Sequence, residues 1–138
     1  MKQSSYVLLA LVIMIAIALI QVPISEAQAP APIAVAEATI CQNVVDREPV
    51  QAGSSFSASV DKLYCFTKII GASGPVDIAH IWYFGDTQRA RVNLTVQSSS
   101  WRTYSSKKIQ SHEIGNWHVD ILGPEGDLLH SLQFKITP

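Results

Sequence analysis

The sequence predicts an all-β protein, a small immunoglobulin-like β-sandwich of about seven strands, preceded by an N-terminal signal helix. Three observations lead to this expectation. Short runs rich in β-branched and aromatic residues start at Thr39 and recur to the C-terminus, with turn residues between them. No stretch in that part of the chain has the period of an amphipathic helix. The first 27 residues have the pattern of an export signal.

The N-terminal segment, residues 1–27, is predicted to be a signal peptide. Lys2 supplies a positive charge, and an unbroken apolar run follows from Val7 to Ile20. This run is shorter than the roughly 20 residues that a bilayer-spanning helix needs. Small residues in Ser25-Glu26-Ala27 predict cleavage after the alanine. The alternative is an uncleaved anchor, in which residues 7–24 hold the protein in the inner membrane.

Residues 28–38 are predicted to be a disordered linker, because alternating Ala and Pro resist both helix and sheet. The β-sandwich domain is then expected over residues 39–138. The mature chain has an ordinary globular composition and is long enough to bury a core without help from a metal.

The expected strands follow from period-2 alternation and from the turn residues that interrupt it. Pro49 is expected to end the first strand, because proline cannot donate to a ladder. The last two strands read as a hairpin, since Gly123-Pro124-Glu125-Gly126 between them is a strong turn signal. In chain order the expected strands are 39–45, a short edge strand 56–60, 63–70, 77–84, 89–96, 101–107, 117–122 and 128–136.

The two cysteines, Cys41 and Cys65, are expected to form a disulfide, since an exported protein with an even cysteine count commonly has one. The alternative is two free thiols that pack as small apolar groups. Their spacing is not C-x-x-C, which argues against a redox or zinc role.

The charge of the chain excludes some partners. The formal net charge is −1 with no polybasic run. Nucleic-acid binding normally requires a basic patch and a high isoelectric point, so no nucleic-acid partner is expected. No basic cluster for an anionic membrane is present either, so membrane contact is expected only if the leader stays uncleaved.

A set of motifs in a fixed order indicates a family. In combination they are more specific than any one of them is alone, and they resemble the bacterial family called domain of unknown function 2914 over Thr39 to Ile136. The resemblance implies an exported or membrane-associated bacterial domain and no assigned activity. The motifs are Cys41, Asp46-Arg47-Glu48-Pro49, Tyr64-Cys65-Phe66-Thr67, His80-Ile81-Trp82-Tyr83, Trp101-Arg102-Thr103-Tyr104-Ser105-Ser106-Lys107 and Gly115-Asn116-Trp117-His118-Val119.

Four residues form the candidate ligand-binding surface: His80, Trp82, Arg102 and Trp117. His80 and Trp82 are two apart on one strand and therefore face the same way. Aromatic faces together with Arg and His donors suit a sugar or a peptide. The alternative is that the tryptophans belong to the core and that His80 and Arg102 satisfy buried backbone groups.

A serine hydrolase is the enzymatic alternative. Ser105 or Ser106, His80 and either Asp77 or Asp120 could be drawn as a triad. No G-x-S-x-G elbow accompanies these residues, so no catalytic residue is expected.

No metal site is expected either. His80, His112, His118 and His130 lack the spacing of a closed zinc site, and His112 and Glu113 would point to opposite faces of a strand.

These observations together predict a non-catalytic, exported module without a cofactor. It would be periplasmic or secreted and would bind a protein, peptide or glycan of the bacterial cell envelope. A membrane-tethered structural accessory subunit is the third possibility. An exposed aromatic cluster would favour binding, and an accessible Ser–His contact would favour the hydrolase.

Overall fold

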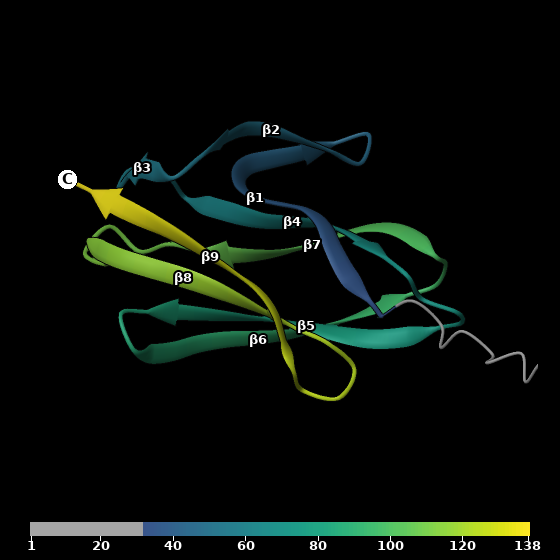
Figure 1. Cartoon of the computed structure of the whole chain (residues 1–138). Helices are drawn as coiled ribbons and strands as arrows, with labels where there is room; N and C mark the ends of the chain where they lie inside the picture. The colour runs from purple at the N-terminus through teal and green to yellow at the C-terminus, as the bar shows by residue number, and fades with distance from the viewer. Residues whose placement is uncertain (1–31) are drawn as a thin grey trace, which may run out of the picture.

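The computed structural model describes residues 32–138. The expected signal segment and the first four residues of the expected linker lie outside this range. The described part is all-β, with nine strands and no helix long and apolar enough to cross a membrane (Figure 1). The strands are β1 (Ala34–Val45), β2 (Glu48–Gly53), β3 (Ser55–Ser57), β4 (Lys62–Ile70), β5 (Val76–Phe84), β6 (Thr87–Val96), β7 (Ser100–Lys108), β8 (Gly115–Leu122) and β9 (Leu128–Thr137).

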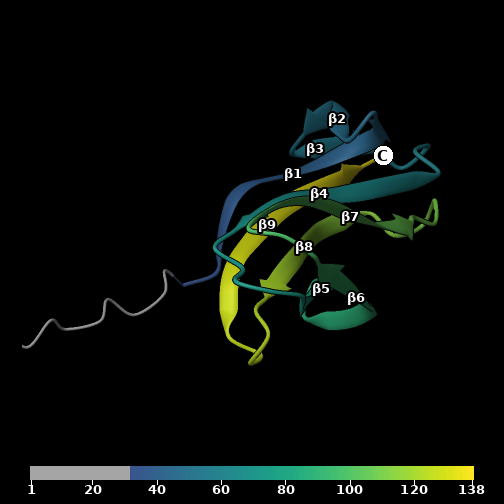
Figure 2. The ribbon, with the colours of Figure 1, turned by 90° about the vertical axis from the view of Figure 1, so that its right-hand side faces the viewer.

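The strands form two sheets that pack face to face. The first sheet has the order β2-β1-β4-β7 and the second the order β3-β9-β8-β5-β6. Neighbouring strands are antiparallel except β3 and β9, which run parallel. Figure 2 shows the two layers with the β1–β2 hairpin above them. Inward side chains of both sheets make two apolar clusters, one around Trp82 and one around Ile78.

The expectation of an all-β, two-sheet architecture is confirmed, whereas the expected number of about seven strands is too low. The terminal hairpin is confirmed, with Trp117 opposite Phe134. The strand that was not expected is β2, residues 48–53, whereas the expected short edge strand 56–60 overlaps β3. The first strand ends at Val45, as expected, but Pro49 lies inside the next strand, β2, and not in the turn. Proline is tolerated there because β2 is at the edge of its sheet.

Strand β1 also begins earlier than the composition indicates. It starts at Ala34, so the last five residues of the expected linker pair with β4. Ile33 and Val35 pack against the cluster around Ile78, and this burial stabilises an Ala-rich segment that has little strand propensity of its own.

The second half of β1 turns back over the first sheet. Up to Cys41 the strand pairs with β4, and beyond Cys41 it pairs with β2 alone. Figure 1 shows the curl of β1 at this point. Phe66 is fully buried although it points away from the other sheet, and it shares a hollow with Val44 of the returning half. The β1–β2 hairpin therefore covers part of the outer face of the first sheet.

The expected disulfide between Cys41 and Cys65 is absent, and both thiols are free and buried. The strand register explains this correction. Cys65 lies opposite Ile40 and faces the core with it, whereas the adjacent Cys41 lies opposite Tyr64 and faces the outer side. Burial raises the pKa of both thiols, so each is a small apolar group rather than a reactive thiolate.

Candidate functional site

The middle of the sandwich holds a polar network that joins the two sheets. His80 of β5 is completely buried, and its Nδ1 lies 2.7 Å from the Ser105 hydroxyl oxygen of β7. The indole N–H of Trp82 donates to the same hydroxyl oxygen at 3.1 Å. On the other side of the ring, His80 Nε2 lies 3.2 Å from Thr67 Oγ1, and Thr67 in turn donates to the Thr103 carbonyl.

The donors and acceptors of this network fix the position of every proton. Thr67 uses its only hydroxyl proton on the Thr103 carbonyl, so it accepts from Nε2–H of His80. The imidazole is then neutral, and Nδ1 accepts from Ser105. Ser105 accepts in its turn from the Trp82 indole, which can only donate. Every polar group in this series of hydrogen bonds, from the Trp82 indole to the Thr103 carbonyl, therefore has a partner.

The buried position changes the chemistry of the imidazole. Loss of solvent lowers the pKa of His80 from 6.5 to about 4, so the ring stays neutral at physiological pH. The partner of Nε2–H is a neutral hydroxyl and no carboxylate in the described part of the chain is hydrogen-bonded to the ring, so nothing offsets the cost of burying a positively charged imidazolium.

The Ser–His contact of the hydrolase alternative therefore exists but lacks the other requirements of that chemistry. Ser105 is 4% exposed, so its hydroxyl is out of reach of a substrate carbonyl. No carboxylate orients the imidazole, because Asp77 accepts from Thr95 and Asp120 accepts from Ser131 on the surface. Ser106 is exposed and points to the opposite face of β7.

Trp117, another predicted site residue, is an anchor for the loop between β7 and β8. It is 1% exposed, and its indole N–H donates to the Glu113 carbonyl at 3.1 Å. The Glu113 side chain is also buried. Its Oε1 accepts from the Gln110 backbone N–H, and its Oε2 lies 2.8 Å from the Arg89 guanidinium as an ion pair, although not in hydrogen-bond geometry. These contacts pin the loop to β6.

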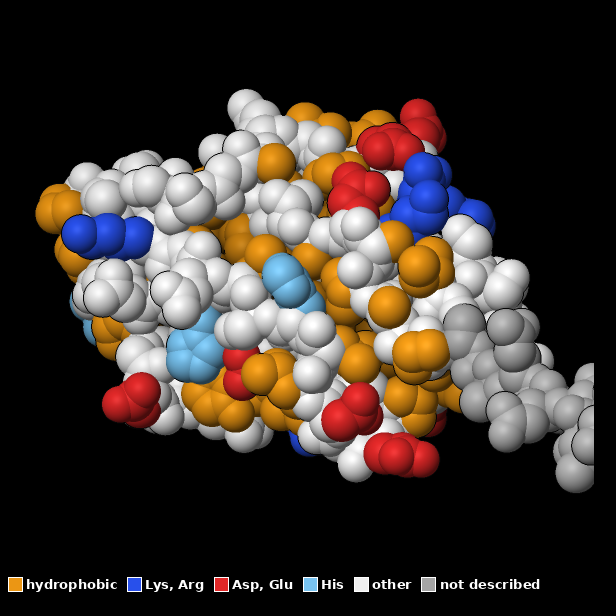
Figure 3. All heavy atoms as spheres, in the orientation of Figure 1, with side chains coloured by type: hydrophobic (Ala, Val, Ile, Leu, Met, Phe, Trp, Pro, Cys, Tyr) orange, Lys and Arg blue, Asp and Glu red, His pale blue; other side chains and the backbone are white. Residues whose placement is uncertain are grey.

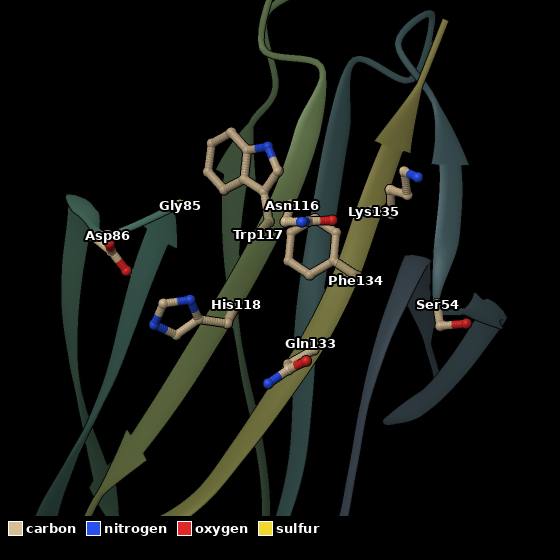
Figure 4. Close-up of a pocket in the computed structure, with 9 residues that line it drawn as sticks. All are labelled: Ser54, Gly85, Asp86, Asn116, Trp117, His118, Gln133, Phe134 and Lys135. Atoms are coloured by element: carbon tan, nitrogen blue, oxygen red, sulfur yellow. The ribbon is translucent and has the colours of Figure 1, made fainter.

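The outer face of the second sheet carries a shallow hollow of about 510 Å³ beside Trp117. Figure 4 shows polar side chains around it, with His118 and Gln133 from adjacent strands and Lys135 and Asp86 at its margins. The His118 ring stacks on Tyr83 with centroids 4.5 Å apart. Its charged side chains, Asp86 and Lys135, are both exposed, as on an ordinary solvated sheet face.

Arg102, the fourth predicted residue, lies on the other side of the molecule. Its guanidinium is 3.1 Å from Glu48 at the start of β2, so it ties the hairpin tip to β7 across β4. Both side chains are well exposed, which makes this ion pair a weak contact. Figure 3 shows charged side chains of both signs gathered over the hairpin tip.

Arg102 lines the larger hollow, about 670 Å³, which we term the arginine groove. One wall is the hairpin tip, with Asp46 and Arg47. The other walls are residues 93–95 of β6, Gln97 after it, and residues 101–104 of β7. The groove thus has two guanidinium groups, one carboxylate, several hydroxyl and amide groups, and the side chains of Trp101 and Tyr104.

The four predicted residues do not share one surface. His80 and Trp82 meet through Ser105 in the interior. Trp117 is buried in the same apolar cluster as Trp82, and both pack against Phe134. Of the four, only Arg102 is an exposed side chain that borders a hollow. Sequence reasoning passed over Arg47. A signal was present, since the two-residue turn Asp46-Arg47 could have been read between two strands if Pro49 had been recognised as an edge-strand residue.

Among residues 32–138 no three His, Cys, Asp or Glu side chains come together in a way that could hold a metal ion. His112 and Glu113, the one adjacent pair of ligand types, are separated by burial, since His112 is exposed and Glu113 is buried in its ion pair.

The fold and these sites define an all-β, two-sheet domain with a structural polar core and open surface hollows. Residues 75–136 match the family described as "Protein of unknown function (DUF2914)". The match confirms, over these residues, the family resemblance expected from the sequence. It spans β5 to β9, so the motifs at Cys41, residues 46–49 and residues 64–67 lie outside it.

No curated protein matches this chain. Two solved structures are similar to this chain at a low level: a β-glucosidase from Kluyveromyces marxianus in complex with glucose, and a β-D-glucoside glucohydrolase from Trichoderma reesei. Identities are 9% and 8%, TM-scores 0.45 and 0.44, and the alignments cover 78% and 77% of this chain. This chain spans only 14% and 19% of those proteins.

Acid should destabilise the fold through His80. Its folded pKa of about 4 lies below the 6.5 of the unfolded chain, so the unfolded state binds the proton first. The stabilisation is complete above about pH 6.5 and is lost as the pH falls to about 4, a change of about 3 kcal/mol. Urea unfolding between pH 4 and 7 measures it. A His80→Gln variant should lose this part of the pH dependence, and His112→Gln should keep it; equal slopes in both variants would contradict the assignment.

Removal of the Ser105 hydroxyl should cost stability. Ser105→Ala leaves the Trp82 N–H and the His80 Nδ1 buried without partners, which we expect to lower the free energy of unfolding by about 2–4 kcal/mol. Ser106→Ala is the matched control and should change it by less than about 0.5 kcal/mol, because Ser106 is exposed. Similar small effects in both variants would show that the network does not stabilise the sandwich.

Proposed function

We propose that this chain is a non-catalytic binding module that recognises an anionic partner through the arginine groove. The proposal rests on the backbone of Arg47. Asp46 and Arg47 both have positive φ, 51° and 62°, and they form the two-residue turn between Val45 and Glu48. Such turns favour glycine at the second position, and a side chain in this conformation costs about 1 kcal/mol or more. Strain of this kind concentrates at functional sites.

The chemistry of the groove supports an anionic partner. Arg102 gives only one contact to Glu48, which leaves further guanidinium N–H groups to donate. Arg47 has no carboxylate partner among residues 32–138. Two arginines on opposite walls can hold a carboxylate or another anion with charge-assisted hydrogen bonds. The partner class is a protein, peptide or glycan with acidic groups, and the hydroxyl and amide groups of the groove suit each of these.

We further propose an immunoglobulin-like topology for the sandwich. The series β1-β4-β7 faces the series β9-β8-β5-β6, which is the strand order of the two sheets in that fold. Another hallmark of that fold is a strand with a core cysteine followed by a strand with a buried tryptophan. Here β4 carries Cys65, the following strand β5 carries Trp82, and the two side chains belong to the same apolar cluster.

A bacterial, exported location also remains a proposal. It rests on the sequence of the first 27 residues and on the bacterial family resemblance. The periplasm or the medium would follow from cleavage after Ala27, and an anchor in the inner membrane would follow from an uncleaved leader. The tethered accessory-subunit role requires the second case.

Binding through the groove can be tested with two acidic probes, an oligogalacturonate and a glutamate-rich peptide. We expect at least one of them to bind the full chain in calorimetric titration. Arg102→Gln and Arg47→Gly should each weaken that binding about tenfold, since each removes a charge-assisted contact. Lys135→Gln, which removes an equal charge from the other sheet, is the control. Arg47→Gly also relieves the turn strain, so its loss of binding cannot be attributed to unfolding. No binding, or equal weakening by the control, would reject the groove.

Export can be tested by the intact mass of the protein from an envelope fraction of a bacterial host. Cleavage after Ala27 predicts a chain that begins at Gln28 and carries two free thiols after denaturation. A full-length mass in the membrane pellet would instead indicate the anchor, and a full-length mass in the cytoplasm would reject export.

A further inference from the structure

The arginine groove borders an unpaired strand edge. β7 has β4 as its only partner in the first sheet, and β6 is likewise at the edge of the second sheet. β7 is a regular strand of nine residues without proline, so one row of its backbone N–H and C=O groups faces away from β4. Residues 101–104 of this strand form a wall of the groove.

The usual protection of such an edge is weak at this point. Natural sheets defend edges with charged side chains, bulges or proline. The register between β4 and β7 is regular over all nine residues, with no bulge. Arg102 is the charged residue in the middle of β7, but it points to the outer face and contacts Glu48. The edge is therefore open to a further strand.

We propose that the groove receives an extended segment of another polypeptide, which adds to β7 as a strand and carries acidic residues at alternate positions. This inference rests on the proposed anion-binding role of the groove. Strand addition supplies main-chain hydrogen bonds, and the pockets for alternate side chains supply specificity.

The alternation follows from the two sides of the groove. Side chains of an added strand point in turn to the outer face and toward the sandwich. On the outer face they meet Arg102 and Arg47, which match carboxylates. Toward the sandwich they meet Leu94 and Trp101, which pack against the apolar cluster and match apolar side chains. The expected occupant therefore alternates acidic and apolar residues.

The test uses a peptide of alternating Val and Glu and the full chain. Two further versions carry N-methyl groups, one on the amides of every Val and the other on those of every Glu. In an added strand only one of these two sets of amides faces β7, so one version should lose about tenfold or more in affinity and the other should bind as well as the parent. Arg102→Gln and Arg47→Gly should weaken the parent peptide, and Lys135→Gln should not.

Each other result separates this inference from the proposed function. If both methylated versions bind as the parent does, or both are weakened equally, the groove binds acidic groups without strand addition, and the inference is overturned while the groove stands. If oligogalacturonate binds and the peptide does not, the conclusion is the same. If neither binds, both proposals fail. If the chain self-associates in sedimentation and the peptide does not compete, the edge pairs with a second copy and the inference is wrong.

Discussion

The contact between His80 and Ser105 is the constraint on which the rest of the sandwich depends. It joins β5 of one sheet to β7 of the other, and the contact with Thr67 extends the network to β4. A polar network at this depth is tolerated only because each of its members has a partner. Because its members come from β4, β5 and β7, the network also favours the arrangement in which β5 faces these two strands.

The network divides the core into two. Along β5, Ile78 belongs to one apolar cluster and Trp82 to the other, with His80 between them. Along β4, Ile69 and Cys65 are separated in the same way by Thr67. A shift of either strand by one residue would move these side chains to the outer face, and a shift by two would bury His80 among apolar groups without partners. The polar layer therefore selects one register.

Much of the fold could be predicted from the sequence, because period-2 alternation and strong turn residues report on local structure. The terminal hairpin and the shared face of Leu132, Phe134 and Ile136 are examples. Strand β2 could not be found in this way, because its small and polar residues have no apolar alternation and it contains Pro49. The expected edge strand 56–60 overlaps β3, but its parallel pairing with the distant β9 could not be foreseen from local pattern.

The candidate site was harder to predict for a related reason. Residue type and spacing gave the common face of His80 and Trp82 and allowed a contact with Ser105, but the depth of burial is a tertiary property. The core interpretation of the tryptophans and the histidine, set beside the binding surface in the sequence analysis, is the one that the structure bears out. The groove forms because β1 folds back and brings Arg47 toward Arg102. No local sequence pattern near residue 41 predicts that bend.

The segment from Glu48 to Ser57 ties the two sheets together at one end of the molecule. It begins at the ion pair with Arg102 beside the arginine groove, passes from one sheet to the other at Ser54, and there borders the hollow on the second sheet. Ser54 also accepts a hydrogen bond from the Lys135 backbone, so the crossing point is fixed to β9. Only one residue of this segment lies outside its strands, so the link between the two sheets has little slack.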